Sequence, residues 1–100
     1  MYKAYIITFD TNKLLDPFDY GVFHDKLISA KGVVDWWHYL KSTYIIIVNW
    51  DIDVNGVSNF ILQVAPNKLF FVTEVKLQNY NGFLPQQAWD WLNRYKNQIY

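Results

Sequence analysis

The chain has 100 residues, of which 52% are hydrophobic, 20% aromatic and 18% charged. This length suffices for one domain, and this composition excludes an intrinsically disordered chain. Nine lysines and arginines balance nine aspartates and glutamates, so the formal net charge at pH 7 is zero. Proteins that hold nucleic acid mainly by neutralising phosphates usually carry a basic excess, so the composition gives that mode of binding no support.

Several site classes and locations are also excluded. The chain has no cysteine, which excludes disulfides and thiolate chemistry, and only two histidines, too few for a multi-histidine zinc site. The longest apolar run, residues 44–48, is far shorter than the roughly 20 residues that span a bilayer. The first apolar stretch soon meets Thr8 and Asp10, unlike a signal peptide. We therefore expect a soluble, cytoplasmic protein with no membrane partner.

The N-terminal third predicts a strand followed by a helix. Aromatic and β-branched residues predict the strand over 2–9. Asp16 before Pro17 resembles a helix N-cap followed by proline at the first helical position. Apolar residues at helical spacing then predict a helix over about 17–30, with Gly32 as its C-terminal stop.

The middle of the chain predicts a hairpin and a second helix. Residues 33–40 and 43–50 have strand composition, and only two residues, 41–42, separate them, which favours a tight hairpin. Asp53 is the predicted cap of the second helix, and Pro66 is its predicted end. The predicted core face of this helix consists of Val57, Phe60, Ile61 and Val64.

A fourth strand is predicted over 68–76, and Pro85 opens a short aromatic helix after the turn-rich stretch 79–82. The resulting order, strand–helix–strand–strand–helix–strand, matches the ferredoxin-like plan. We therefore expect a single α+β domain over 1–100. Its four-stranded antiparallel sheet carries two helices on one face, and residues 77–100 form an added strand or helix tail.

The predicted strands are apolar on both faces, which is unusual for such a sheet. In the first strand Tyr5 and Ile7 share one face, while Ile6 points to the other. The runs 44–48 and 69–72 are apolar on both faces as well. The second face must therefore be covered, either by the aromatic C-terminal segment or by a second copy of the chain, and we expect a homodimer.

Three polar residues are candidates for chemistry. Asp10, at the end of the first strand, could bind a divalent metal, especially where a two-fold axis doubles the carboxylates, although turn geometry alone also explains it. His38 could act as a general acid or base or as a metal ligand, or it could be a surface histidine among aromatic residues. Ser42 could act as a nucleophile only with a base beside it. His24 is predicted to be an ordinary solvated position in the first helix.

Aromatic residues gather around the predicted hairpin and could stack on nucleic-acid bases. Basic residues do not interleave with them, so packing in the core and in a dimer explains them better than base stacking does. The aromatic residues in question are Trp36, Trp37, Tyr39, Tyr44 and Trp50.

Five features occur together along the chain: Phe9-Asp10 ending the first strand, Trp36-Trp37-His38-Tyr39 before the turn, and the aliphatic run 44–48, followed by 69–75 and 89–92. Together they resemble small bacterial proteins that are similar to the second CRISPR-associated protein and are often labelled as SinR family. The virulence-associated protein D toxins share this fold plan. The resemblance covers nearly the whole chain, although the loop after Asp10 carries only Lys13 where related nucleases carry arginines.

The resemblance implies a ferredoxin-like homodimer with facing sheets, in which the segment 77–100 can cross to the partner. In nuclease members the acidic residue that ends the first strand holds a metal at the dimer axis, which here implies Asp10 with Mg²⁺ or Mn²⁺. The implied activity is a metal-dependent endoribonuclease or DNase. We expect His38 and Ser42 to be secondary catalytic partners of Asp10 if the hairpin folds toward the dimer axis. The alternative is a non-catalytic dimeric module that docks a protein partner through aromatic surface.

Overall fold

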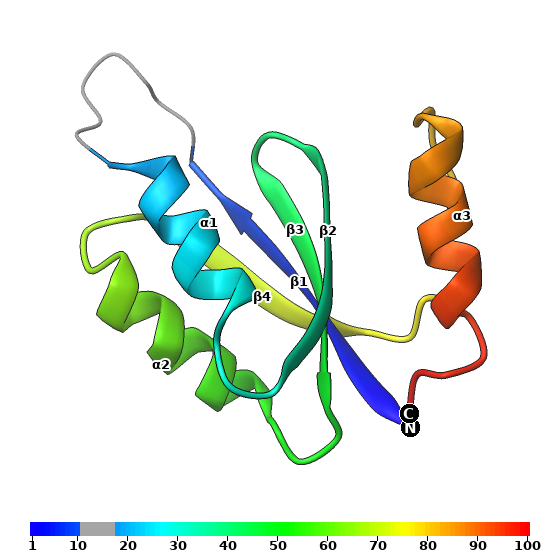
Figure 1. The fold of residues 1–100 in the computed structure, drawn as a ribbon, viewed down its shortest axis with the longest axis horizontal. Coiled ribbons are helices and arrows are strands. Elements are labelled where there is room, and N and C mark those ends of the chain that lie inside the picture. The colour runs from blue at the N-terminus through cyan, green and yellow to red at the C-terminus, as the bar shows by residue number, and fades with distance from the viewer. Residues whose placement is uncertain (11–17) are drawn as a thin grey trace.

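The computed structural model describes residues 1–10 and 18–100. Its elements, in chain order, are β1 (Tyr2–Phe9), α1 (Tyr20–Ile28), β2 (Val33–Leu40), β3 (Thr43–Asn49), α2 (Val54–Val64), β4 (Phe70–Val75) and α3 (Gln86–Tyr95). The strands form one sheet in the order β2-β3-β1-β4, and all neighbouring strands are antiparallel (Figure 1). The predicted α+β class with a four-stranded antiparallel sheet is therefore confirmed.

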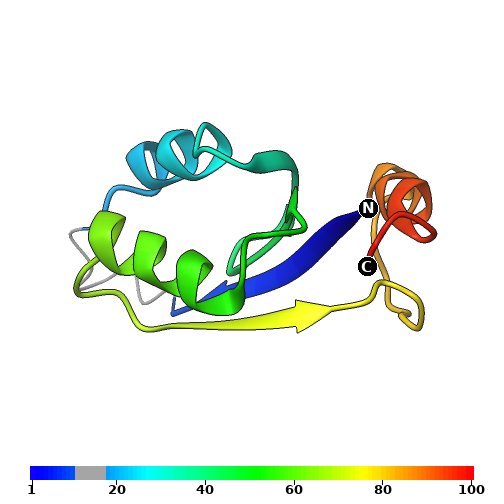
Figure 2. The same cartoon turned by 90° about the horizontal axis from the view of Figure 1, so that it is seen from below.

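Helices cover both faces of this sheet. In Figure 2, α1 and α2 lie together on one face, and α3 lies apart from them beside the start of β1. Along β1, Tyr5 and Ile7 are buried against α1 and α2, whereas Ala4 belongs to a second core with α3. Along β3, Ile46 and Ile47 divide between the two cores in the same way. The strands are apolar on both faces because each face contributes to a core.

The C-terminal segment folds back onto its own chain and covers part of the second face. After α3, Tyr2 N–H donates to the carbonyl of Gln98 at 2.9 Å, and Tyr100 N–H donates to the carbonyl of Tyr2 at 2.7 Å. Trp91 and Ile99 are buried in the second core with β3 residues. The chain's own tail, one of the two coverings expected for this face, is therefore present over this part of it. None of the described helices has both the length and the apolar character needed to cross a membrane.

The first helix is shorter than the sequence predicts. It begins at Tyr20, because the side chain of Asp19 accepts the N–H of Val22 at 3.0 Å and acts as the N-cap. Asp16 and Pro17, the predicted cap, lie outside the described residues. The helix ends at Ile28, so the prediction that Gly32 stops it was wrong.

The remaining boundaries agree with the sequence analysis to within two residues. The Asp53 side chain accepts the N–H of Gly56 at 2.8 Å, which confirms it as the cap of α2. Pro85 precedes α3 as predicted. β3 stops one residue early, with Trp50 in a turn, and β4 covers only 70–75 of the predicted 68–76. Strand ends are the least certain part of such a prediction because neighbouring turns have similar composition.

Gly32 joins α1 to β2 in a conformation that favours glycine. Its φ is +90°, and an added Cβ would lie 2.2 Å from Cδ1 of Ile52. We therefore expect Gly32→Ala to lower the free energy of unfolding by about 1–2 kcal/mol, measured by urea denaturation. Gly56→Ala is the matched control. Its Cβ would meet only ordinary contacts in α2, so this variant should match or exceed wild-type stability; equal destabilisation by both would contradict the argument.

Candidate active site

Two of the predicted site residues lie at the same end of the sheet. Phe9 N–H donates to the carbonyl of Ser42 at 3.0 Å, which places the end of β1 beside the β2–β3 turn. Figure 1 shows the end of β1 and this turn at the top of the molecule. Asp10 is exposed there, and its N–H donates to the carbonyl of Leu69 at 3.1 Å. β3, β1 and the residue preceding β4 thus meet at this end.

His38 is held in a defined orientation at the end of β2. Its Nδ1 lies 2.9 Å from the carbonyl oxygen of Thr43, and its ring stacks on the ring of Tyr44 with centroids 3.9 Å apart. A carbonyl oxygen only accepts hydrogen bonds, so Nδ1 of His38 carries the proton. In the neutral ring, Nε2 then has the lone pair and can accept a proton.

The structure brings His24, to which the sequence analysis gave no role, to the same place. Its Nδ1 lies 2.7 Å from the hydroxyl oxygen of Tyr44, and its ring centroid is 6.3 Å from that of His38. The Trp36 ring meets His24 edge to face at 4.7 Å. One residue each from α1 and β3 and two from β2 therefore form a cluster, which we call the histidine pair site: His24, Trp36, His38 and Tyr44.

Both histidines present Nε2 to solvent. Among the described residues, each ring forms its hydrogen bond through Nδ1, and neither Nε2 has a hydrogen-bond partner. Over residues 1–10 and 18–100, the one side-chain nitrogen or oxygen that is both buried and without a partner is Nε1 of Trp91. The Nε2 atoms of His24 and His38 are therefore accessible, and each can exchange a proton with a bound molecule.

Tyr44 is the buried member of the site, with only 2% of its surface exposed. Burial raises its pKa from 10.0 to about 12. The hydroxyl therefore keeps its proton at neutral pH. It can donate to Nδ1 of His24 when that ring is neutral and accept from it when the ring is protonated.

The raised pKa of Tyr44 predicts a loss of stability in alkali. The folded state favours the neutral phenol, so the stabilisation is complete below pH 10.0 and is lost as the pH rises through about 12. Tyr95, whose pKa burial and a hydrogen bond to Asp35 also raise to about 12, contributes in the same window. We expect Tyr44→Phe to lose less stability than wild type over this range in urea denaturation. Parallel losses in the two proteins would contradict this prediction.

Ser42 and Asp10 are less well placed for the roles considered for them. Ser42 Oγ lies 3.5 Å from Oγ1 of Thr43 and forms no hydrogen bond with His38. No group of three or more histidine, aspartate or glutamate side chains that could hold a metal occurs within the described ranges. A single chain thus offers one carboxylate at the end of β1, and a metal site at Asp10 needs ligands from elsewhere.

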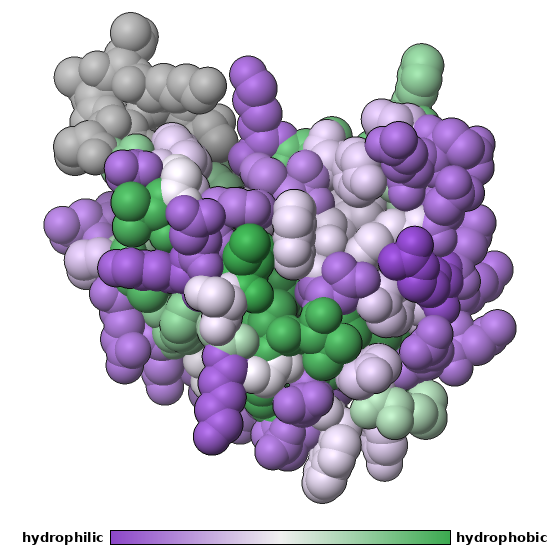
Figure 3. Space-filling view, in the orientation of Figure 1, coloured by the Kyte–Doolittle hydropathy of each residue, from purple (hydrophilic) through white to green (hydrophobic). Residues whose placement is uncertain are grey.

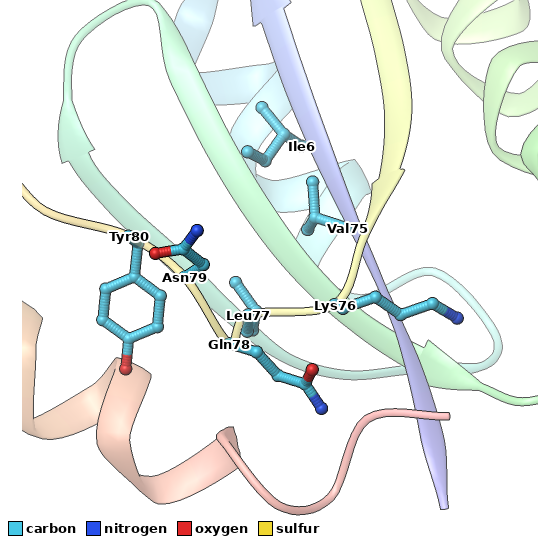
Figure 4. A pocket seen from close by; sticks show the side chains of 7 residues that line it. All are labelled: Ile6, Val75, Lys76, Leu77, Gln78, Asn79 and Tyr80. Carbon is cyan, nitrogen blue, oxygen red and sulfur yellow. The ribbon is translucent and has the colours of Figure 1, made fainter.

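A separate hollow of about 350 Å³ lies on the opposite face of the sheet, between Ile6 and the segment 75–80 (Figure 4). Figure 4 shows Ile6, Val75 and Leu77 forming its apolar part. Its titratable side chains are Lys76, whose Nζ donates to the main-chain oxygen of Tyr100 at 2.6 Å, and Tyr80. This hollow lies apart from the histidines, because Tyr44 belongs to the core on the other face.

Comparisons of the chain with protein-family models, curated proteins and solved structures gave no match. The function is therefore inferred from the chemistry of the residues at the site. The site chemistry that they offer is a pair of accessible imidazoles beside a half-exposed tryptophan.

Proposed function

We propose that this protein is a ribonuclease that cleaves RNA by general acid–base catalysis at the histidine pair site. The observation that carries this proposal is the placement of His24 and His38, whose ring centroids are 6.3 Å apart and whose Nε2 atoms are both accessible. A general acid or base acts within about 2.6–3.2 Å of the proton that it transfers. Two rings at this separation can reach two oxygens of one phosphodiester.

The proposed reaction uses the 2′-hydroxyl of RNA as the nucleophile. Nε2 of neutral His38 takes the 2′-hydroxyl proton, and the 2′-oxygen forms a new bond to phosphorus. The bond to the 5′-oxygen breaks, and protonated His24 donates the proton that this leaving group needs. The products are a 2′,3′-cyclic phosphate and a 5′-hydroxyl. Water or buffer then removes the proton from His38 and protonates His24 again.

Trp36 supplies a surface on which a base can stack next to the reacting phosphate. Its side chain is 37% exposed, and its ring centroid lies 4.7 Å from that of His24. Stacking on an aromatic ring contributes about 1–3 kcal/mol per base and requires no basic excess. A substrate held in this way suits a chain with zero net charge, and single-stranded RNA is the substrate with exposed base faces.

The finer fold assignment belongs to the same proposal. A sheet in the order β2-β3-β1-β4, with helices between β1 and β2 and between β3 and β4, supports the ferredoxin-like plan. The proposed resemblance to CRISPR-associated and toxin nucleases of this plan agrees with a nucleic-acid substrate. It favours a different mechanism, in which Asp10 holds Mg²⁺ or Mn²⁺.

One assay separates the two mechanisms. RNA and DNA oligonucleotides of the same sequence are incubated with the protein in Mg²⁺, in Mn²⁺ and in chelator, using wild type and Asp10→Asn. The histidine mechanism predicts cleavage of RNA alone, in chelator and in both proteins, with cyclic phosphate ends. Cleavage that requires both metal and Asp10, on RNA or DNA, would overturn the histidine mechanism in favour of the metal mechanism.

Exposed apolar side chains along β2 favour protein docking as a second candidate function. Four large side chains on this edge strand are exposed: Val34, Trp36, Tyr39 and Leu40. Figure 3 shows hydrophobic side chains gathered at the centre of this face, where β2 lies in Figure 1, and hydrophilic ones over α3. If no nucleic acid is cleaved, a partner that binds wild type and Trp50→Ala but not Tyr39→Ala would establish docking here.

A further inference from the structure

Within residues 1–10 and 18–100, no strand pairs with the outer edge of β4. β4 is the last strand in the sheet order, and among the described elements it packs against β1 and α2. In Figure 2 it forms the lower border of the molecule. From this edge we infer that two copies of the chain associate by antiparallel β4–β4 pairing about a two-fold axis at Phe71. This inference does not depend on the proposed catalytic activity.

The two edges of the sheet differ in regularity. β2 pairs with β3 through two register shifts, between Val33 and Asp35 and between Trp37 and Leu40. β4 pairs with β1 without a shift from Val75 to Phe70. Irregularities of the first kind protect an edge strand from pairing with another chain. β4 has no such irregularity, so its outer edge is regular enough to pair with a strand of another chain.

The direction of the main-chain groups limits how a second strand can pair. The carbonyl of Leu69 accepts a hydrogen bond from Asp10 and so points toward β1. Main-chain groups alternate along a strand, so those of Phe70, Val72 and Glu74 point outward. These outward N–H and C=O groups would form the hydrogen bonds to a second copy.

A two-fold axis at Phe71 satisfies both the hydrogen bonds and the charges. Val72 then lies opposite Phe70 of the second copy, and both residues have outward main-chain groups. Glu74 lies opposite Lys68 of the second copy, on the same face of the joined sheet, and the symmetry repeats this pair. Lys68 Nζ donates to the Tyr20 hydroxyl at 2.8 Å, and Glu74 lies 3.5 Å from Lys76 Nζ of its own chain, so the dimer would set the Glu74 carboxylate between two lysines.

Neighbouring registers lack this charge match. An axis at Val72 sets Lys68 opposite Lys76 of the second copy, which places like charges together twice. An axis at Thr73 sets Glu74 opposite Val72 and leaves no pair of opposite charges. Cross-strand pairs of opposite charge stabilise a sheet and like charges destabilise it, so the axis at Phe71 is favoured.

Exposed apolar surface is centred on the same axis. The Phe71 side chain is 63% exposed, on the sheet face opposite α1 and α2, and Leu69 is exposed beside it. In the joined sheet the two Phe71 rings meet directly, and the zero net charge of the chain adds no overall repulsion. This is a side-by-side dimer, unlike the facing sheets that the resemblance implies. It keeps the two Asp10 residues apart, because β4 of each copy lies between β1 and the axis.

The association is tested on the full chain by sedimentation equilibrium over a range of concentrations. We expect a mass twice that of the chain for wild type. Phe71→Lys should raise the dissociation constant by at least about 100-fold, because like charges would meet on the axis. Phe83→Lys is the matched control, since Phe83 is fully exposed outside β4 and should leave the dimer intact. A wild-type monomer at all concentrations, or a dimer unaffected by Phe71→Lys, would overturn the proposal.

The register is tested by single cysteines, because the natural chain contains none. Phe71 on the axis forms a non-hydrogen-bonded pair with itself, with Cα atoms about 4.5 Å apart, within the range that a disulfide spans. Phe71→Cys should therefore form a covalent dimer under mild oxidation. Thr73→Cys should not, since its two copies would lie about 13 Å apart along the strands. The opposite result would overturn the axis at Phe71.

Discussion

Replacing Trp37 with alanine is expected to lower the free energy of unfolding by about 3–5 kcal/mol. The side chain is 3% exposed and is packed in the second core between β3 and α3. Its Nε1 donates to the carbonyl of Ala88 at 3.4 Å, which joins this indole to α3. The substitution would therefore leave a cavity and weaken the attachment of α3 to the sheet.

Trp50→Ala is the matched control for Trp37→Ala. Trp50 is 65% exposed in the turn after β3, so its removal should change stability by no more than about 0.5 kcal/mol. Both variants are compared with wild type by urea denaturation, followed by far-UV circular dichroism because tryptophan fluorescence differs among them. Similar losses in the two variants would show that α3 does not pack on Trp37 as described.

The two cores could be predicted from the sequence because side chains alternate strictly along a strand. Tyr5 and Ile7 fall on one face and Ile6 on the other whatever the strand packs against. Alternation shows that a face is buried but does not show what buries it. Whether the tail of the same chain or a second copy covers the face depends on the path of residues 77–100, which local pattern does not determine.

The start of α1 shows a different limit. Asp16 and Asp19 are both good N-caps three residues apart, and proline after Asp16 favours the earlier one. The structure starts the helix after Asp19, whose side chain accepts the N–H of Val22. A helix from either start keeps the same register and turns Phe23 and Leu27 to the same core, so their apolar spacing does not distinguish the two caps.

The histidine pair site could be predicted only in part. His38 is recognisable from its place between aromatic residues and the hairpin turn. His24 could be found only by noticing that it follows the core residue Phe23 and borders the apolar face of its helix. Its partner, Tyr44, is 20 residues away along the chain, and no local spacing connects the two. Their contact exists because α1 packs beside β2 and over the sheet.

If the histidine pair is catalytic, His38→Gln should reduce the rate of RNA cleavage by about 10²–10⁴-fold, the usual contribution of one general acid or base. Glutamine keeps an N–H that can donate to the Thr43 carbonyl but has no group that takes up a proton at neutral pH. His24→Gln should cause a similar loss. The double variant should lose little more than either single variant, because both groups act in one step.

The dependence of cleavage on pH distinguishes catalysis from a merely structural role. Wild type should show a bell-shaped profile, because one imidazole must be neutral while the other is protonated. His38→Gln should lose the acidic limb, which reports the base, and His24→Gln should lose the alkaline limb, which reports the acid. Circular dichroism and urea denaturation show whether either variant remains folded. Two folded variants that keep the wild-type profile, and differ from it only in overall rate, would assign the histidines to the packing around Tyr44 and not to proton transfer.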